Sequence, residues 1–421
     1  MKALSILTAV CLAGVSPVHA QTPRPADMID LDRPFDRYLW ITAHNAANHG
    51  SLVPNQTLPV DLQLVRGVRG LMFDIYERDG RLFNCHADCA FHGRKAPLEE
   101  DLGHVQRFLD GHPEAVVTLQ LEDYNSRGAM EAFARENPSL FALSFNPTDP
   151  RWRALDGRWP TLRQMIQAGQ RLLVFTQRAE LAGAYGGSNA WFMHDQDISS
   201  ENYWSLGPTI LQHDYSCRPR WPGIPLDSTS MPLGFPRLFV MNHFHGVPLS
   251  LHAGTDNRLD VLSDRLRDQC LPAAGRMPAY LAVDFIEWGD SLELAETYNN
   301  GGVIAYADNA ATEPVCAFST AFDRSWSLTS TPRMGCEDNA IRALALRGAR
   351  AGARIVLHHD ANGARPGTVV DILQDVDWNT PQLLSSLDQD TDTPYLRVRT
   401  SSSGPLNGRV SRITVERNPG P

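Results

Sequence analysis

The sequence reads Gly67-Val68-Arg69-Gly70-Leu71-Met72-Phe73-Asp74 where a glycine-bounded apolar run ends in a carboxylate. An earlier run, Tyr38 to Thr42, leads directly into Ala43-His44-Asn45, and Cys85-His86 follows soon after Asp74. Short apolar runs bounded by glycine are typical of buried strands. Two histidines, an amide and a carboxylate therefore stand near the ends of consecutive predicted strands, a combination suited to acid/base cleavage of a phosphodiester.

Runs of strand length alternate with helix-period segments through most of the chain. The further candidate strands are Ala115 to Leu121, Arg171 to Thr176, Leu238 to Asn242, Ala279 to Phe285 and Val303 to Tyr306. Helical stripes lie between them, made by Leu98, Leu102, Val105, Phe108 and Leu109, by Leu162, Met165 and Ile166 after a capping Thr161, and by Leu259, Leu262, Leu266 and Cys270. This alternation predicts an α/β fold with a parallel sheet, most simply a (β/α) barrel over residues 30–310.

Two regions depart from the alternation. Residues Tyr203 to Arg237 are rich in Pro, Gly, Trp and Ser without periodicity, which indicates a long surface excursion held by Cys217. Residues 312–421 carry short alternating runs separated by turn-rich stretches, which predicts a small all-β, sandwich-like module. The runs are Arg354 to Leu357, Val369 to Leu373, Tyr395 to Arg399 and Val410 to Val415.

The first twenty residues predict a secretory signal peptide. Lys2 precedes an apolar run from Ala3 to Val15, and Val18-His19-Ala20 forms a small-residue cleavage site. We therefore expect a secreted or periplasmic protein. Six cysteines remain after cleavage, and an even number in an exported chain predicts disulfides. Fifteen connectivities are possible; we favour nearest-neighbour pairing, Cys85 with Cys89, Cys217 with Cys270 and Cys316 with Cys336.

The charge argues against some partners. Lysine and arginine number 38 against 48 aspartate and glutamate residues, a net charge of −10, and the chain has no basic run. Nucleic acid is therefore not an expected partner. An acidic protein has no general attraction to anionic membranes, so lipid contact must be local. Trp204, Trp221 and Phe235 in the excursion are candidates for an apolar rim, with ordinary packing of the loop as the alternative.

Strand alternation brings the polar residues to one end of the barrel. Side chains two apart share a face, and the carboxyl ends of barrel strands form the mouth where active sites assemble. We expect convergence of His44, Asn45, Asp74, His86, Glu122 and Asp284. Two histidines supply an acid and a base, and the oxygens of Asn45, Asp74 and Glu122 suit Ca²⁺ or Mg²⁺. The alternatives are a structural histidine at a strand end and a carboxylate that caps the next helix.

Two other metal patterns are weaker. The run from Cys85 to His92 has mixed sulfur and imidazole ligands suited to zinc, but a Cys85–Cys89 disulfide is favoured in an exported chain. The run from Asp388 to Asp392 begins like a calcium loop. Thr393 stands where that loop needs glycine and Arg399 where it needs glutamate, so we expect a solvated acidic turn.

Together the motifs of residues 36 to 306 resemble the X-domain of phosphatidylinositol-specific phospholipase C, in particular its secreted plant, fungal and bacterial branch. The segments that carry the resemblance are Thr42 to Asn45, Gly67 to Tyr76, Cys85-His86, Val117 to Tyr124, Gln170 to Thr176 and Ala282 to Phe285. Six motifs in the right order are far more specific than any one of them. The resemblance implies a distorted TIM-type barrel, to which the C-terminal all-β module is an addition.

The resemblance also implies roles for individual residues. His44 is similar to the general base that deprotonates the inositol 2-hydroxyl, and His86 to the general acid that protonates the diacylglycerol oxygen. Asp284 would orient His44. Arg178 lies near a basic substrate-binding position, and we also expect Arg69 to contact the substrate. Asn45, Asp74 and Glu122 fit the calcium-dependent members, although Met72 stands at the position of a further carboxylate.

The expected function is that of an exported phospholipase C cleaving phosphatidylinositol or a glycosyl-inositol phospholipid. Lys95 is the only lysine after signal cleavage, which argues against polyphosphorylated head groups. One rival is a barrel enzyme acting on another diester, of the glycerophosphodiester or sphingomyelin type. Another is a catalytically silent lipid- or glycan-binding protein, with the C-terminal module contacting glycan. The presence of both His44 and His86 argues against a silent protein.

Overall fold

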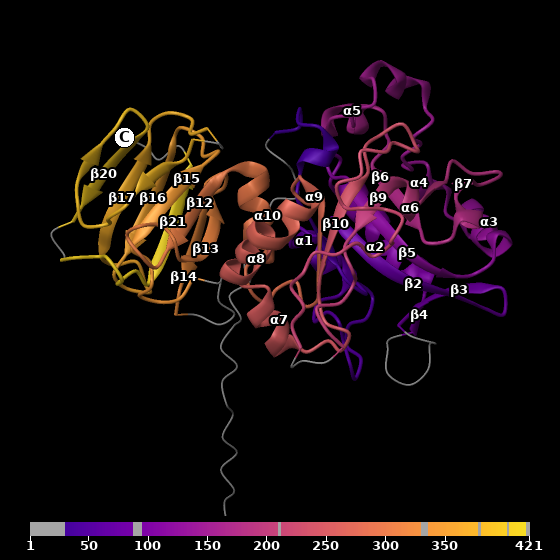
Figure 1. Cartoon of the computed structure of the whole chain (residues 1–421), viewed down its shortest axis with the longest axis horizontal. Helices are drawn as coiled ribbons and strands as arrows, with labels where there is room; N and C mark the ends of the chain where they lie inside the picture. The colour runs from indigo at the N-terminus through magenta and orange to yellow at the C-terminus, as the bar shows by residue number, and fades with distance from the viewer. Residues whose placement is uncertain are drawn as a thin grey trace, which may run out of the picture.

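The computed structural model describes residues 30–86, 95–208, 212–329, 336–377, 380–401 and 404–417 (Figure 1). The predicted signal peptide, residues 1–20, and the predicted disulfide partner Cys89 lie outside these ranges. In the described part of the chain, helices are too short or too polar to cross a bilayer.

Eight parallel strands form a curled sheet in the first part of the chain. In spatial order they are β9 (Ser199–Glu201), β10 (Leu238–His243), β11 (Tyr280–Val283), β1 (Trp40–Ala43), β2 (Gly70–Arg78), β5 (Val117–Tyr124), β6 (Leu172–Thr176) and β8 (Trp191–His194). This is the sequential order of a (β/α) barrel. The order begins at β9 and ends at β8, which are joined through α6 (Asp195–Ile198) rather than paired, so the barrel is distorted and open on one side. The predicted α/β barrel class is confirmed.

Burial on both faces explains why these strands are continuous apolar runs. Every residue of β1, β6, β10 and β11 is buried. The glycine in the second motif has a steric cause: a Cβ on Gly70 would lie 2.1 Å from Oγ1 of Thr42, on the neighbouring strand. A side chain at Gly70 would therefore push β2 away from β1 and misplace the residues that follow both strands.

Helices cover the outside of the sheet (Figure 1). They are α1 (Val60–Val65), α2 (Leu98–Gly111), α3 (Arg127–Glu136), α4 (Pro138–Phe141), α5 (Leu162–Gln167), α7 (Ser250–Asp256), α8 (Leu259–Arg265), α9 (Leu271–Ala274) and α10 (Ser291–Asn300). The expected stripe of α2 is buried, and Thr161 caps α5 through a capping box with Gln164. A hairpin of β3 (Arg81–Cys85) and β4 (Lys95–Pro97) extends from β2, and β7 (Gly183–Ala184) pairs with β8.

The excursion is held as predicted by a disulfide between Cys217 and Cys270. Its aromatic residues do not share one environment. Phe235 is 3% exposed and stacks on Trp159 at 4.8 Å between ring centroids, so its prediction as a rim residue is wrong. Trp221 is half-buried beneath the guanidinium of Arg220, whereas Trp204 is 40% exposed.

Two antiparallel sheets form the C-terminal module (Figure 1). One sheet has the order β13 (Pro314–Ser319), β12 (Gly302–Tyr306), β15 (Ala343–Arg347) and β18 (Gln382–Leu384). The other has the order β14 (Arg324–Ser327), β21 (Arg412–Arg417), β16 (Ala353–His358), β17 (Pro366–Ile372), β20 (Leu396–Thr400) and β19 (Thr391–Asp392). Buried residues of both sheets form one core, including Val303, Leu346, Leu357 and Val398. The predicted Cys316–Cys336 disulfide is present.

Strand β12 corrects one expectation. Val303 to Tyr306 was expected among the parallel strands, but β12 pairs antiparallel with β13 and β15. A short connection returns the chain from β12 to β13, and a connection of that length permits only antiparallel pairing. The all-β unit therefore begins at Gly302 in the structure, ahead of the expected boundary at 312.

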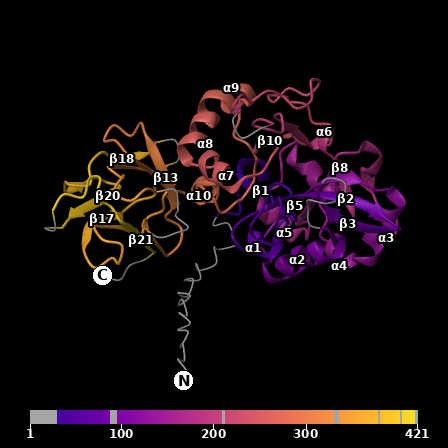
Figure 2. The ribbon, with the colours of Figure 1, turned by 90° about the horizontal axis from the view of Figure 1, so that it is seen from below.

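Helix α10 joins the barrel to the sandwich. Figure 2 shows α8 and α10 between the two sets of strands. The Arg324 guanidinium of the sandwich pairs with Glu296 of α10 through two contacts of 2.8 and 3.0 Å. Both side chains are largely buried, at 13% and 10% exposure. The ion pair thus lies inside the contact between the two units.

Candidate active site

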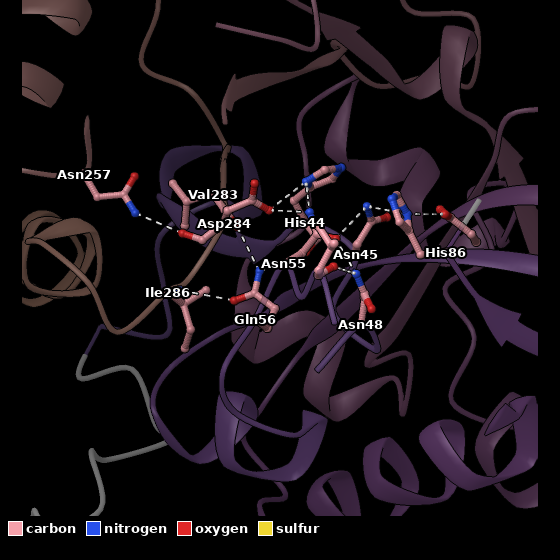
Figure 3. A network of polar contacts seen from close by, with 12 residues as sticks. His44, Asn45, Asn48, Asn55, Gln56, His86, Asn257, Val283, Asp284 and Ile286 are labelled. Carbon is pink, nitrogen blue, oxygen red and sulfur yellow. Dashed lines mark hydrogen bonds and ion pairs between the residues drawn. The ribbon is translucent and has the colours of Figure 1, made fainter. Parts of the chain in front are cut away.

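A cavity of about 450 Å³ opens at the carboxyl ends of the parallel strands. Its walls carry five of the six polar residues that were expected to converge. They are His44, Asn45, Asp74, His86 and Glu122. The sixth, Asp284, is not part of the cavity lining. It contacts the ring of His44, which is (Figure 3).

His44 is held in one orientation by its neighbours (Figure 3). The His44 backbone N–H donates to the carbonyl of Val283 at 3.0 Å, which brings His44 beside the residue after β11. Its Nδ1 lies 2.9 Å from Oδ1 of Asp284. A carboxylate on Nδ1 fixes the tautomer with the proton on Nδ1 and leaves Nε2 as the basic nitrogen. The His44 ring stacks on the ring of Phe244, with centroids 3.6 Å apart and an interplanar angle of 9°.

Asp284 is itself buried and fixed. Asn55 Nδ2 donates to the same Oδ1 at 2.9 Å, and Asn257 Nδ2 donates to the Asp284 backbone carbonyl at 3.0 Å (Figure 3). Asp284 is 4% exposed. A carboxylate restrained in this way can stabilise the imidazolium that forms when His44 accepts a proton.

His86, after β3, is the second titratable ring of the cavity. Its Nδ1 lies 3.3 Å from Oδ2 of Asp74 and 3.0 Å from Nδ2 of Asn45. The hydrogen bond to Asp74 raises the pKa of His86 and outweighs the opposing effect of burial. His86 is therefore favoured in the protonated form, as a general acid requires. The backbone of Asn45 has a φ of +45°, a left-handed conformation that asparagine tolerates better than most residues.

The carboxylates Asp74 and Glu122 are neighbours across a parallel strand pair. The register of β2 and β5 places Asp74 opposite Glu122, and Met72 opposite Gln120. Glu122 accepts a hydrogen bond from the Tyr124 hydroxyl. Together with Asn45 they present three oxygen-bearing side chains on one wall, the donor type that Ca²⁺ prefers. Met72 lines the same wall and offers no oxygen.

The opposite wall contains polar residues that the sequence did not single out. Arg220 Nη1 lies 3.0 Å from both carboxylate oxygens of Glu201, and Asn242 Nδ2 donates to Glu201 Oε1 at 2.6 Å. Asp195 lies nearby, where burial raises its pKa to about 6. Glu201 ends β9 and Asn242 lies in β10, so strand-end position could have indicated both. Arg220 lies in the aperiodic excursion, where no local pattern marks it.

The two arginines predicted to bind substrate lie elsewhere. Arg69 precedes β2 at the amino end of the strand, whereas Asp74 lies in the middle of β2. Its Nη1 donates to the carbonyls of Leu64 at 2.9 Å and Val68 at 2.7 Å, and its guanidinium lies over Phe108. Arg69 is thus a buried structural group.

Arg178 follows β6 but turns away from the cavity. Its Nη1 donates to the Asn125 carbonyl at 2.9 Å and its Nε to Glu180 at 2.7 Å. Within the described part of the lining, Arg220 is the one arginine or lysine that reaches the cavity.

Part of this chain is similar to known proteins. Residues 31–185 match the family model PI-PLC X 1. A PI-PLC X domain-containing protein of Arabidopsis thaliana is 29% identical over 75% of this chain and 74% of its own length. PI-PLC X domain-containing protein 1 of Arthroderma benhamiae is 31% identical over 34% of this chain and 47% of its own length.

The phosphatidylinositol-specific phospholipase C from Listeria monocytogenes superposes with a TM-score of 0.42 and 13% identity, over 64% of this chain and 96% of that one. By the family model and the curated relatives, residues 31–185 of this chain are similar to the PI-PLC X-domain family.

Proposed function

We propose that this protein is an exported phosphodiesterase of the phospholipase C type that cleaves phosphatidylinositol or a glycosyl-inositol phospholipid. The observation that carries the proposal is the pairing of two histidines with two carboxylates around one cavity. His44 contacts Asp284 at 2.9 Å, and His86 contacts Asp74 at 3.3 Å. One ring is arranged as a base and the other as an acid, which an internal displacement at phosphorus requires.

The proposed reaction is transfer of the phosphoryl group to a neighbouring hydroxyl. His44 Nε2 accepts the proton of the inositol 2-hydroxyl, and the oxygen attacks phosphorus. The bond between phosphorus and the diacylglycerol oxygen breaks as the new P–O bond forms, and His86 donates its proton to the leaving oxygen. The products are a cyclic inositol phosphate and diacylglycerol. Asp284 acts through His44 as a positioning residue.

The charge on the phosphoryl oxygens also needs stabilisation. Asn45, Asp74 and Glu122 would hold a divalent cation such as Ca²⁺, which when bound neutralises charge on the phosphoryl group. Ca²⁺ takes six to eight oxygen ligands. Three side chains supply part of that number and leave positions for phosphate and water, so the donor set fits a cation that binds together with substrate.

The second wall supports a polyol head group. Glu201, Arg220 and Asn242 combine acceptors and donors of the kind that bind hydroxyl groups, opposite the wall that carries His86. Arg220 is already neutralised by Glu201 at 3.0 Å. A cavity whose described lining has a single, paired arginine favours an inositol ring without further phosphates.

Exposed apolar side chains support transient contact with a lipid surface. They lie on the segments that follow β1, β9, β10 and β11, all at the carboxyl end of the barrel. They are Leu52, Trp204, Val247, Leu249, Leu251 and Trp288. Apolar side chains around a cavity mouth can enter the boundary between head groups and acyl chains. A glycan contact through the C-terminal module stays a prediction.

Export is supported by two disulfides in the described chain and by likeness to an Arthroderma benhamiae protein named as an uncharacterized secreted protein. That relative is 30% identical over 34% of this chain and 32% of its own length.

The test is ³¹P NMR of the purified protein with phosphatidylinositol in mixed micelles, with Ca²⁺ and then with chelator. A cyclic phosphodiester signal is expected from the wild type and from His104→Ala, an exchange on α2 outside the cavity. The signal should be lost in His44→Ala and His86→Ala. Turnover that persists in chelator removes the cation from the proposal. A product without a cyclic phosphate assigns the enzyme to another diester, and no turnover removes the proposed function.

A further inference from the structure

A second cluster of ligand-type side chains lies beside the active cavity and is not used by the proposed reaction. It consists of His213 in the excursion, His245 just after β10, and Asp256 at the end of α7. One ligand atom of each residue lies within 4.8 Å of the corresponding atoms of the other two. None of the three belongs to the Asn45, Asp74 and Glu122 set.

The carboxylate of Asp256 stands between the two imidazoles. Its Oδ2 lies 2.9 Å from Nε2 of His245, and its Oδ1 lies 3.4 Å from Nε2 of His213. The two rings are perpendicular, with an interplanar angle of 87° and centroids 4.9 Å apart. Three segments distant in sequence thus direct two nitrogens and a carboxylate toward one point.

The burial of the cluster favours a bound ligand over a solvated group of charges. Asp256 and His245 are 2% and 5% exposed, while His213 faces solvent and leaves an entry path. Nδ1 of His245 is buried and has no hydrogen-bond partner in the described part of the chain. A buried ring nitrogen without a partner is uncommon in proteins.

The surroundings of Asp256 resemble the support that metal ligands have in proteins. The Tyr215 hydroxyl donates to Oδ1 at 2.8 Å, and His243 Nε2 lies 2.8 Å from the backbone carbonyl. The carboxylate is therefore held in one orientation, as a metal ligand in a protein is.

We propose that His213, His245 and Asp256 bind one divalent cation of the Zn²⁺ class. Two imidazole nitrogens and one carboxylate are a donor set for zinc and neighbouring d-block ions rather than for Ca²⁺, which prefers oxygen ligands. Three protein ligands leave one position of a tetrahedral ion. His252 lies one helical turn before Asp256 on α7, with its ring 6.2 Å from that of His245, so a further imidazole lies near the cluster.

The ion would connect the cavity wall at His245 to the excursion and to α7. His245 and Gly246 line the cavity, and Phe244, the residue before them, stacks on the catalytic ring of His44. The Cys217–Cys270 disulfide fastens the same excursion four residues after His213. Bound metal would hold the end of β10 and the excursion against α7, and so fix the surface on which His44 rests.

The test uses the full-length protein after chelator treatment, titrated with Co²⁺ alone and then with Zn²⁺. The wild type is expected to bind one equivalent of Co²⁺ with the intense visible absorption of a tetrahedral site, and Zn²⁺ should displace it. His213→Ala changes a solvent-facing ring and should fold. His213→Ala and Asp256→Asn should each weaken Co²⁺ binding at least tenfold. The matched control His104→Ala should bind as the wild type does.

Asp74→Asn separates this ion from a cation of the catalytic cavity. Co²⁺ binding that survives Asp74→Asn but not His213→Ala supports the proposal. No tetrahedral Co²⁺ signal in the wild type overturns it, as does binding that His213→Ala leaves unchanged or that Asp74→Asn abolishes. Because metal binding is read without substrate, its failure is distinct from a failure of phosphodiester cleavage.

Discussion

His44 and Asp284 are 240 residues apart in the chain, yet His44 Nδ1 lies 2.9 Å from Asp284 Oδ1. The parallel pairing of β1 with β11 explains the contact. The register aligns Ala43 with Val283, so the next residue on each strand leaves the sheet at the same level. The contact between His44 and Asp284 is therefore a direct consequence of strand register, and a one-residue slip would separate the pair.

Replacing Asp284 with asparagine tests the positioning role. Asp284→Asn keeps the size of the side chain but removes the charge that stabilises the His44 imidazolium. We expect kcat for phosphatidylinositol cleavage to fall about 10²- to 10⁴-fold with little change in KM. Asp260→Asn, an exposed exchange on α8, is the control and should retain activity. If KM rises by as large a factor as kcat falls, the result would instead indicate a collapsed cavity.

The Asp74–His86 contact predicts a shift in titration. Hydrogen bonding to Asp74 raises the pKa of His86 above its ordinary value of 6.5. The contact therefore stabilises the fold fully below pH 6.5, and this contribution is lost as the pH rises through the folded-state pKa. Asp74→Asn should lower the NMR titration midpoint of the His86 ring in metal-free protein.

The same exchange has a kinetic consequence. The alkaline limb of kcat/KM reports an acid that must be protonated, so it should move to lower pH in Asp74→Asn. Asp61→Asn, on the exposed side of α1, should change neither the titration midpoint of His86 nor the alkaline limb of kcat/KM. A His86 midpoint unchanged by Asp74→Asn would remove Asp74 as the cause.

The sequence predicted most of the barrel because strands buried on both faces are continuous apolar runs. It also located His44, Asp74 and Glu122, since each follows or ends such a run. It could not tell which residues of a strand face the cavity. Arg69 and Asp74 share one motif, yet Arg69 precedes β2 at its amino end and Asp74 lies within the strand and lines the cavity. Arg220 has no local pattern, and only the folded excursion brings it to Glu201. The apolar run of β12 does not specify its pairing partner, so its place in the sandwich was missed.

Asp123 predicts a stability gain that depends on pH. Burial raises its pKa to about 7 despite a hydrogen bond from the Thr176 hydroxyl at 2.6 Å. Between about pH 4, the ordinary carboxyl value, and pH 7, the folded state keeps a proton that the unfolded chain releases, so stability falls as pH rises. Asp123→Asn removes this loss and should raise the free energy of unfolding at pH 8 by up to about 4 kcal/mol.

Urea unfolding at pH 5 and pH 8 checks this expectation. The gain from Asp123→Asn should be larger at pH 8 than at pH 5. Asp197→Asn exchanges a half-exposed carboxylate and should show no such difference. An equal gain at both values would mean that the amide improves packing and that ionisation of Asp123 has no part in it.

The two disulfides stabilise different units. Cys217–Cys270 closes a separation of 53 residues in the barrel, and Cys316–Cys336 closes 20 in the sandwich. Loop entropy predicts about 4 and 3 kcal/mol for their contributions. In scanning calorimetry, Cys217→Ser with Cys270→Ser should lower the barrel transition, and Cys316→Ser with Cys336→Ser the sandwich transition. Two variants that lower one common transition would show that the units unfold together.

The exposed leucines at the cavity mouth predict separation of membrane binding from chemistry. Leu249 and Leu251 are 42% and 76% exposed, and both lie at the start of α7, where aspartate is compatible with a helix N-terminus. Leu249→Asp with Leu251→Asp should weaken binding to phosphatidylinositol vesicles about 100-fold or more, since each leucine loses about 1.5 kcal/mol or more of apolar burial. Cleavage of a monomeric short-chain substrate should persist, because neither side chain reaches His44 or His86. Leu373→Asp with Leu383→Asp is the control, since these leucines of the sandwich are 41% and 53% exposed. If the control pair weakens vesicle binding and the α7 pair does not, the lipid surface meets the sandwich, and the cavity must take its substrate from solution.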